Sequence, residues 1–199
     1  MGVDSSIYEK LYAGSNYGAY PKGSRRLDQV HKWVKKYVPW QGTVFDFGCG
    51  RGHLLRKLLT SGYKCCGYEP CGYLIGHDLA GLPLRGCAIY TALYDPWWLP
   101  PSQFDCVVAS DVLEHLPTEE EALDLLRKLC GFARKFVVIT VGVGPSNASA
   151  NLPGVDYELH TVLRAPGWWR AQIASHVDIV AEASIKKSAL FCGKVKANG

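Results

Sequence analysis

The sequence lacks any apolar stretch long enough to cross a membrane. None of its 199 residues lie in a run that approaches the roughly 18 consecutive apolar residues of a membrane-spanning helix. Residues 1–6 also lack the charged and then apolar pattern of a signal peptide. We therefore expect a cytoplasmic protein that has no membrane partner.

The eight cysteines are not spaced as a zinc site or a disulfide framework requires. Three of them cluster, but no second pair of cysteine or histidine residues accompanies them at zinc spacing. The other five stand singly in apolar runs, where a free cysteine behaves as a small hydrophobic residue. The clustered three are Cys65, Cys66 and Cys71. We therefore expect reduced thiols and no metal site.

Dense runs of positive charge are also missing, although the formal net charge is +4. The lysines and arginines occur in small scattered groups, and none of these groups alternates with aromatic rings as a nucleic-acid-binding surface would. The sequence therefore does not indicate a nucleic-acid partner, and it does not exclude one. It also leaves the oligomeric state open.

No internal repeat, low-complexity tract or long linker divides the chain, and its length is that of one ordinary domain. Residues 1–23 are rich in tyrosine and glycine, which predicts an N-terminal arm ahead of a domain at 24–199. Tyrosine rings could cover a ligand and glycines could act as hinges. We therefore predict that residues 8–23 form a lid that excludes water from a bound ligand.

Apolar residues make up 48% of the chain, enough to build a core, and their spacing alternates between the strand and helix periods. Strands are predicted at 43–47, 63–69, 87–92, 104–109, 136–141, 177–185 and 189–195, with helices beginning near residues 24, 53, 118 and 166. Alternating strands and helices indicate a parallel sheet covered on both faces. The last two strands are close enough to form a hairpin. We predict an α/β fold, Rossmann-like and doubly wound, with a mostly parallel seven-stranded sheet and a C-terminal antiparallel hairpin.

The most informative motif is Asp-Phe-Gly-Cys-Gly-Arg-Gly at 46–52, between a predicted strand and a predicted helix. Glycines at such a turn allow sharp bends and let a ligand approach the main chain closely. Glu69 ends the next strand, 23 residues after Asp46, at the spacing where a carboxylate binds two ribose hydroxyls. Together these features predict a site for a ribose-containing cofactor.

These motifs resemble those of the class I S-adenosylmethionine-dependent methyltransferases, especially the small single-domain members from phages and bacteria. The segment 44–52 is similar to their glycine motif, 67–70 to their acidic strand end, and 104–117 to their fourth-strand motif. The resemblance covers about residues 24–145, in order and in spacing. It implies a methyltransferase that uses S-adenosyl-L-methionine. The residues it implies for the cofactor are Asp46, Gly48, Cys49, Gly50, Gly52, Glu69, Pro70, Asp95, Ser110 and Asp111.

The chemistry of this cofactor suits the charge of Asp46. S-adenosyl-L-methionine carries an ammonium group and a sulfonium but no phosphate, whereas a carboxylate ahead of the glycines would repel a pyrophosphate. Alternatively, Asp46 only stabilises the glycine turn through hydrogen bonds. Two other functions remain open: a nicotinamide-dependent oxidoreductase and a non-catalytic module that binds a cofactor.

His160 and Glu158 are the candidate catalytic residues, because they follow the fifth strand, where the resemblance places substrate sites. A histidine oriented by a carboxylate can act as a general base. His115 is a second candidate, although it can equally serve to orient the helix that follows it. The methyl acceptor is not determined. Ser110 and Asp111 stand where an Asn-Pro-Pro-Tyr motif would be required, which disfavours methylation of a flipped base at its amino group.

Overall fold

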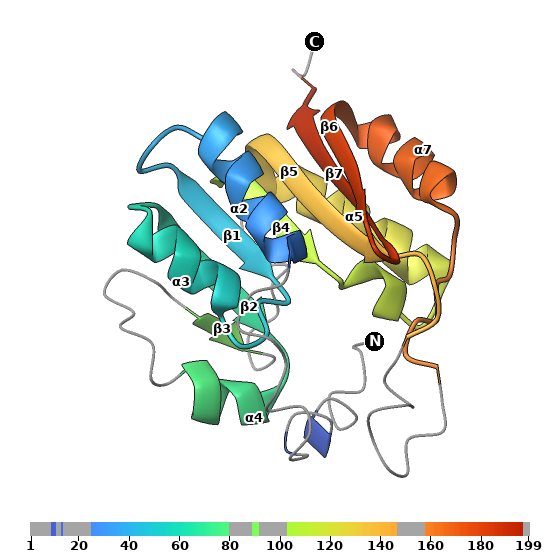
Figure 1. Cartoon of the computed structure of the whole chain (residues 1–199), viewed down its shortest axis with the longest axis horizontal. Helices are drawn as coiled ribbons and strands as arrows, with labels where there is room; N and C mark the ends of the chain where they lie inside the picture. Colours follow the sequence, from blue (N-terminus) through green and yellow to red (C-terminus); the bar gives the residue numbers. More distant parts are fainter. Residues whose placement is uncertain are drawn as a thin grey trace.

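The core of the computed structural model is a sheet that has seven strands within the described residues, which are 9–10, 13, 25–79, 89–91, 103–146 and 158–196 (Figure 1). The strands are β1 (Thr43–Phe47), β2 (Lys64–Glu69), β3 (Ile89–Thr91), β4 (Phe104–Ser110), β5 (Ala133–Gly142), β6 (Val177–Ile185) and β7 (Ser188–Val195). Their order across the sheet is β3-β2-β1-β4-β5-β7-β6. The predicted fold is thereby confirmed.

Strand direction separates the sheet into a parallel part and a terminal hairpin. Strands β3, β2, β1, β4 and β5 are paired in parallel, whereas β7 is antiparallel to both β5 and β6. The strand order reverses between β1 and β4. In doubly wound sheets the crevice for ligands lies at the carboxyl ends of the strands beside such a reversal.

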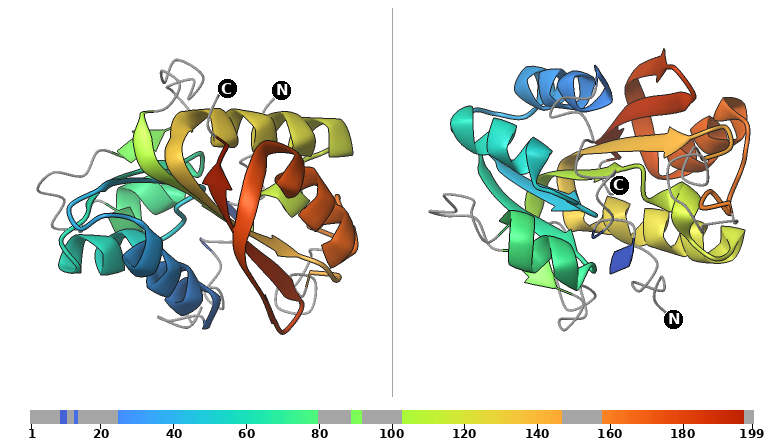
Figure 2. Two further views of the ribbon diagram at one scale, coloured as in Figure 1. Left: turned by 90° about the horizontal axis from the view of Figure 1, so that it is seen from above. Right: turned by 60° about the horizontal axis from the view of Figure 1, so that its bottom comes forward.

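Helices cover both faces of the sheet, as the continuous apolar runs of its central strands require. Figure 2 shows α2 (Arg25–Tyr37) and α3 (His53–Thr60) on one face, and α5 (Glu119–Phe132) and α7 (Pro166–His176) on the other. Each pair buries an apolar stripe against its own core cluster. The shorter elements are α4 (Gly72–Leu74), η2 (Ile75–Leu79) and η4 (Leu113–His115).

Two helices begin where the sequence predicts them, at local capping signals. The Thr118 hydroxyl accepts a hydrogen bond from the Glu121 amide at 3.2 Å, at the start of α5. Pro166 occupies the first turn of α7, where a missing amide hydrogen removes no helical hydrogen bond. Trp169 and Ile173 then face the core, with 0% and 1% exposure.

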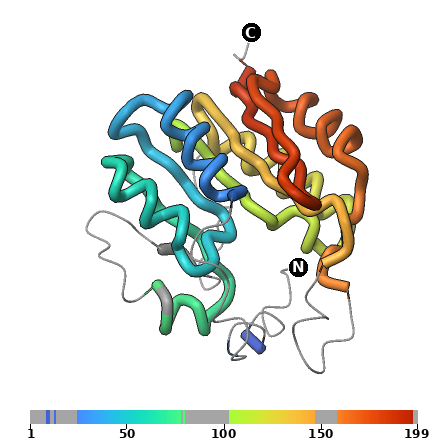
Figure 3. The backbone as a smooth tube through the Cα atoms, in the orientation of Figure 1, coloured from blue at the N-terminus to red at the C-terminus, as the bar shows by residue number. Residues whose placement is uncertain are grey.

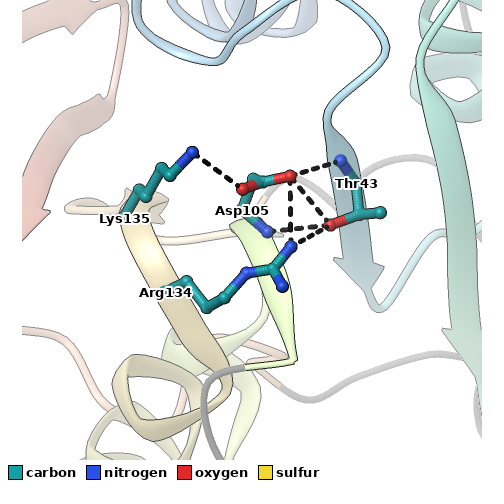
Figure 4. Close-up of polar contacts among 4 residues, drawn as sticks. All are labelled: Thr43, Asp105, Arg134 and Lys135. Atoms are coloured by element: carbon teal, nitrogen blue, oxygen red, sulfur yellow. Dashed lines mark hydrogen bonds and ion pairs between the residues drawn. The ribbon is translucent and has the colours of Figure 1, made fainter.

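A polar cluster ties together the amino ends of β1, β4 and β5 (Figure 4). The Asp105 carboxylate accepts from the Thr43 amide at 2.9 Å and forms ion pairs with Lys135 at 3.2 Å and Arg134 at 3.3 Å. Burial acts to raise the pKa of Asp105, but the hydrogen bonds and the two cations together hold it below its ordinary value. This cluster is structural, because it lies at the strand ends opposite the crevice.

No helix in the described part of the chain is both long enough and apolar enough to span a membrane. Its seven described cysteines are all free thiols.

Candidate active site

The carboxyl ends of β1, β2, β4 and β5 bring together most of the residues that the sequence singled out. We refer to this edge of the sheet, where doubly wound folds bind ligands, as the crevice. Figure 3 follows the chain from β1 through the glycine turn into α3 and back along β2. Because parallel strands end at the same edge of a sheet, residues far apart in the sequence meet here.

The glycine turn after β1 adopts backbone angles that favour glycine. The φ angles of Gly48, Gly50 and Gly52 are 71°, 52° and 70°. The Gly48 and Cys49 amides donate to the carbonyl of Tyr68 at 2.8 and 3.0 Å, which fixes the turn against the end of β2. The turn is therefore a rigid, preformed element.

Glu69 at the end of β2 faces this turn and is only 6% exposed. One carboxylate oxygen accepts from the Gly50 amide at 2.8 Å, and the other accepts from the Cys71 amide at 2.9 Å. Burial raises the pKa of Glu69, while the two amide hydrogen bonds oppose that effect. Because a carboxylate has about four lone-pair positions, acceptor capacity remains for two ribose hydroxyls.

Space around the turn differs sharply between its glycines. A Cβ atom on Gly48 would lie 2.6 Å from Cγ2 of Val112, whereas a Cβ atom on Gly50 would meet no atom within 4 Å. A Cβ atom on Gly67, in β2, would lie 2.8 Å from the sulfur of Cys49. Gly48 and Gly67 thus permit close packing, and Gly50 borders open space that a ligand can occupy.

The remaining predicted residues of the turn are also placed by the structure. Asp46 is 2% exposed near the end of β1, and Cys49 is 8% exposed. Gly52 precedes α3, and its amide donates to the Cys49 carbonyl. Pro70 directly follows Glu69 at the end of β2 and is half-buried.

Ser110 ends β4 on the other side of the crevice, and Asp111 directly follows it. The side-chain oxygen of Ser110 is buried without a hydrogen-bond partner. Asp111 forms an ion pair with Arg26 of α2 at 2.9 Å, and its carboxylate accepts from the Thr140 hydroxyl at 3.1 Å. Burial raises the pKa of Asp111, while Arg26 and Thr140 favour its charged form. The Arg26 guanidinium and the Asp111 carboxylate therefore lie together at the end of β4.

Two of the sequence predictions fall outside the described residues. Asp95, one of the residues that the resemblance implies for the cofactor, is one of them. The proposed lid at 8–23 is the other, since only residues 9–10 and 13 of that segment are described.

His160 lies near the crevice, and its imidazole is hydrogen-bonded to a backbone carbonyl. The Glu158 carboxylate accepts from the backbone amides of Ser146 and His160, at 2.7 and 2.9 Å. The imidazole instead uses Nδ1 to donate to the carbonyl of Gly144 at 2.6 Å. The Glu158 carboxylate thus accepts from two backbone amides of its own loop, and its orienting role toward the imidazole stays a prediction.

His115 and His160 pack edge to face, with ring centroids 4.8 Å apart. The Nδ1 atom of His115 donates to the Leu159 carbonyl at 2.9 Å. Burial, together with the neighbouring His160, lowers the pKa of His115 to about 4, so that its ring is neutral at neutral pH. Both histidines are thereby held by carbonyls of the loops after β5.

Glu114 is fully buried beside them, and sequence reasoning missed its part in the site. One carboxylate oxygen accepts from the Gly142 amide at 2.5 Å, and the other has no hydrogen-bond partner. Burial and the nearby Asp111 carboxylate raise the pKa of Glu114 to about 8. Arg26 and Thr140 were missed as well. No local pattern marks these residues, because each meets its partner only through the fold.

Comparisons with known proteins agree on the class of this fold. A family model described as a methyltransferase domain matches residues 23–187. A chain from the complex between the Haloferax volcanii Trm112 methyltransferase activator and a methyltransferase has a TM-score of 0.75 at 11% identity, and covers 100% of this chain and 99% of that one.

Two further solved structures are similar. Magnesium protoporphyrin IX methyltransferase from Synechocystis PCC 6803 with bound SAH gives a TM-score of 0.68 at 18% identity, over 98% of this chain and 96% of that one. An S-adenosylmethionine-dependent methyltransferase from Listeria monocytogenes gives 0.64 at 12% identity, over 85% and 100%. Among curated protein sequences, none matches this chain.

Proposed function

The chain belongs to the methyltransferase domain family, and from this premise we propose that it binds S-adenosyl-L-methionine and transfers the methyl group to an acceptor. The observation that carries the proposal is the pairing of Glu69 with the glycine turn. A buried carboxylate with spare acceptor capacity stands beside open space at Gly50. A ribose diol is the complementary donor group.

The polar groups across the crevice suit the amino-acid part of the same cofactor. Its ammonium group and its carboxylate match the Asp111 carboxylate and the Arg26 guanidinium, which lie 2.9 Å apart. The Ser110 hydroxyl is a further buried group that lacks a partner. Cofactor binding would thus use Asp46, Gly48, Cys49, Gly50, Gly52, Glu69, Pro70, Asp95, Ser110 and Asp111, as the sequence predicts.

The cofactor supplies a methyl group on a sulfonium, and the neutral thioether that leaves needs little acid assistance. The contribution of the protein is to place the acceptor close to the methyl group and to exclude water. An acceptor that keeps its proton at neutral pH also needs a base. We propose His160 for this role, since its Nδ1 donates to Gly144 and its Nε2 therefore carries the lone pair.

Calorimetric titration with S-adenosyl-L-methionine, S-adenosylhomocysteine and NAD tests the proposal directly. We expect the first two to bind and NAD not to bind, because Asp46 would repel a pyrophosphate. Binding of NAD alone would favour the oxidoreductase alternative instead. A screen of methyl acceptors with labelled cofactor then separates an enzyme from a non-catalytic binding module, since the module would never produce S-adenosylhomocysteine.

Two alanine substitutions in the glycine turn are expected to have different effects. Gly48→Ala should lower the free energy of unfolding by about 2–5 kcal/mol, because a positive φ costs about 1–2 kcal/mol and overpacking against Val112 adds about 1–3 kcal/mol. Gly50→Ala should lower the free energy of unfolding only by the cost of the positive φ, about 1–2 kcal/mol. It should nevertheless weaken cofactor binding, because its methyl group fills the open space. Chemical denaturation and calorimetry measure the two effects.

A rescue experiment checks the physical reason for this difference. Val112→Ala should recover part of the lost stability in the Gly48→Ala background, and should recover nothing in the Gly50→Ala background. Equal stability of the two single variants would contradict the close contact between Gly48 and Val112.

A further inference from the structure

Three potential metal ligands meet at the end of the crevice near the segment after β5, where we expect the methyl acceptor to bind. We call this end the acceptor side. Glu114 and His115 lie in η4, after β4, and His160 lies in the segment that precedes α7. Each offers one ligand atom, and these atoms all lie within 4.8 Å of one another. Among the residues that the structure describes, no other group of three has this arrangement.

The spacing of these atoms is close to what a bound cation requires. Three atoms within 4.8 Å of one another share a centre no more than about 2.8 Å from each of them. Bonds from zinc to nitrogen or oxygen are about 2.0–2.2 Å long. Side-chain shifts of up to about 0.6–0.8 Å would therefore bring all three atoms to bonding distance.

Backbone carbonyls hold both imidazoles as metal-ligating histidines are usually held. Nδ1 of His115 faces the Leu159 carbonyl, and Nδ1 of His160 faces the Gly144 carbonyl. A carbonyl oxygen only accepts hydrogen bonds, so each Nδ1 carries the proton and each Nε2 carries the lone pair. Such outer partners fix the tautomer and the ring orientation of a metal ligand.

The carboxyl group of Glu114 supplies the third ligand, and only one of its two oxygens is hydrogen-bonded. Its second oxygen is buried without a hydrogen-bond partner. None of the ion pairs between described residues includes Glu114. A buried carboxylate that is neither paired nor bound to a metal is costly, and a cation at this point would offset that cost.

We propose that Glu114, His115 and His160 bind a divalent transition-metal ion on the acceptor side of the crevice. Two imidazoles and one carboxylate are the ligand set of catalytic zinc sites and of non-haem iron sites, and they leave coordination positions open. Magnesium is disfavoured, because it prefers oxygen ligands. This site depends on the tertiary structure, and it replaces the sequence-based expectation that no metal is bound.

A bound ion would also indicate which kind of atom accepts the methyl group. This part of the proposal rests on the proposed methyl transfer. An acceptor hydroxyl bound to the ion through its oxygen has a lowered pKa and releases its proton to solvent. The oxygen then forms a bond to the methyl carbon while the carbon–sulfur bond breaks, and the electron pair of that bond stays on sulfur. The structure thus favours an oxygen acceptor. On this proposal Nε2 of His160 binds the ion, which replaces the general-base role given to His160 under the proposed function.

Cobalt(II) is a suitable probe, because its visible absorption reports coordination by protein ligands. The full chain, first dialysed against a chelator, is titrated with Co²⁺, and Zn²⁺ is then added as a competitor. We expect one equivalent of Co²⁺ to bind, zinc to displace it, and excess Mg²⁺ to leave the spectrum unchanged. Absence of saturable binding would overturn the proposal.

Two variants assign the ligands. Glu114→Gln keeps an acceptor for the Gly142 amide but offers no charged ligand, and His160→Ala changes a half-buried side chain. Each should weaken Co²⁺ binding by more than about 100-fold, since even outer partners of metal ligands contribute about 10–100-fold. His176→Ala, at the end of α7 and outside the three-residue cluster, is the matched control and should bind Co²⁺ normally.

Thermal unfolding of each variant and calorimetry with S-adenosylhomocysteine complete the test. Folded variants that bind Co²⁺ as the parent does would overturn the ligand assignment. Loss of Co²⁺ binding with intact S-adenosylhomocysteine binding is the expected result. Failure of S-adenosylhomocysteine to bind even the parent protein would instead contradict the proposed function, and it would leave the metal measurement valid.

Discussion

Glu69→Ala is expected to weaken the binding of S-adenosyl-L-methionine and S-adenosylhomocysteine by about 10²–10⁴-fold. Two hydrogen bonds from the ribose hydroxyls to a charged carboxylate would be lost, and each contributes about 1.5–3 kcal/mol. The Gly50 and Cys71 amides would also lose their acceptor. The turn would then be less well held for binding. Titration calorimetry with either ligand measures the effect.

Two further substitutions serve as controls for this prediction. Glu69→Gln keeps an acceptor of the same shape without charge, so its affinity should fall between those of the parent and Glu69→Ala. Glu182 lies on β6, away from the glycine turn, and its exposed carboxylate pairs with Arg170 of α7. Glu182→Ala should therefore bind S-adenosylhomocysteine as the parent does. Undiminished affinity in Glu69→Ala would refute the cofactor assignment.

The second large effect is expected at His160. His160→Ala should lower the turnover number by ~10²–10⁴-fold once an acceptor is known, the size typical of losing a positioned acid–base group. Affinity for S-adenosylhomocysteine should stay nearly intact, since the residues proposed for the cofactor lie on other segments. Steady-state kinetics and calorimetry measure the two quantities. A rise in the KM of the acceptor without a fall in the turnover number would instead make His160 a substrate-binding donor.

A chelator distinguishes between the two uses of the His160 lone pair. If Nε2 binds a cation, the parent enzyme should lose activity after dialysis against a chelator and regain it with Zn²⁺. If Nε2 accepts the proton directly, the same treatment should leave turnover unchanged. His160→Ala should stay inactive with added Zn²⁺ in either case, because the missing side chain supplies both functions.

Much of the fold could be predicted because its signals are local. The run from Phe136 to Val141 is apolar without alternation, and β5 is indeed a central strand covered on both faces. Thr118 and Pro166 mark helix starts through interactions within one turn of the chain. Such patterns depend on the periods of helix and strand, which the sequence displays directly.

The parts of the candidate site that could be predicted are likewise those with local signals. The glycine turn and Glu69 could be recognised because a single strand–turn–helix–strand unit contains both. The hydrogen bonds of Glu158 could not be predicted, since the two-residue spacing to His160 does not reveal that backbone amides donate to its carboxylate. The sequence contains no sign of where the polar groups of a loop point.

The sequence by itself determined the order of elements, the glycine turn after β1 and the acidic residue beside it. Only the tertiary structure decided that Arg26 meets Asp111 and that Glu114 and His115 meet His160. These pairings depend on which strand ends become neighbours at the carboxyl edge of the sheet, and on how loops fold over that edge. The physical reason is that hydrogen bonds and ion pairs act over a few ångströms in space, whatever the separation of their residues along the chain.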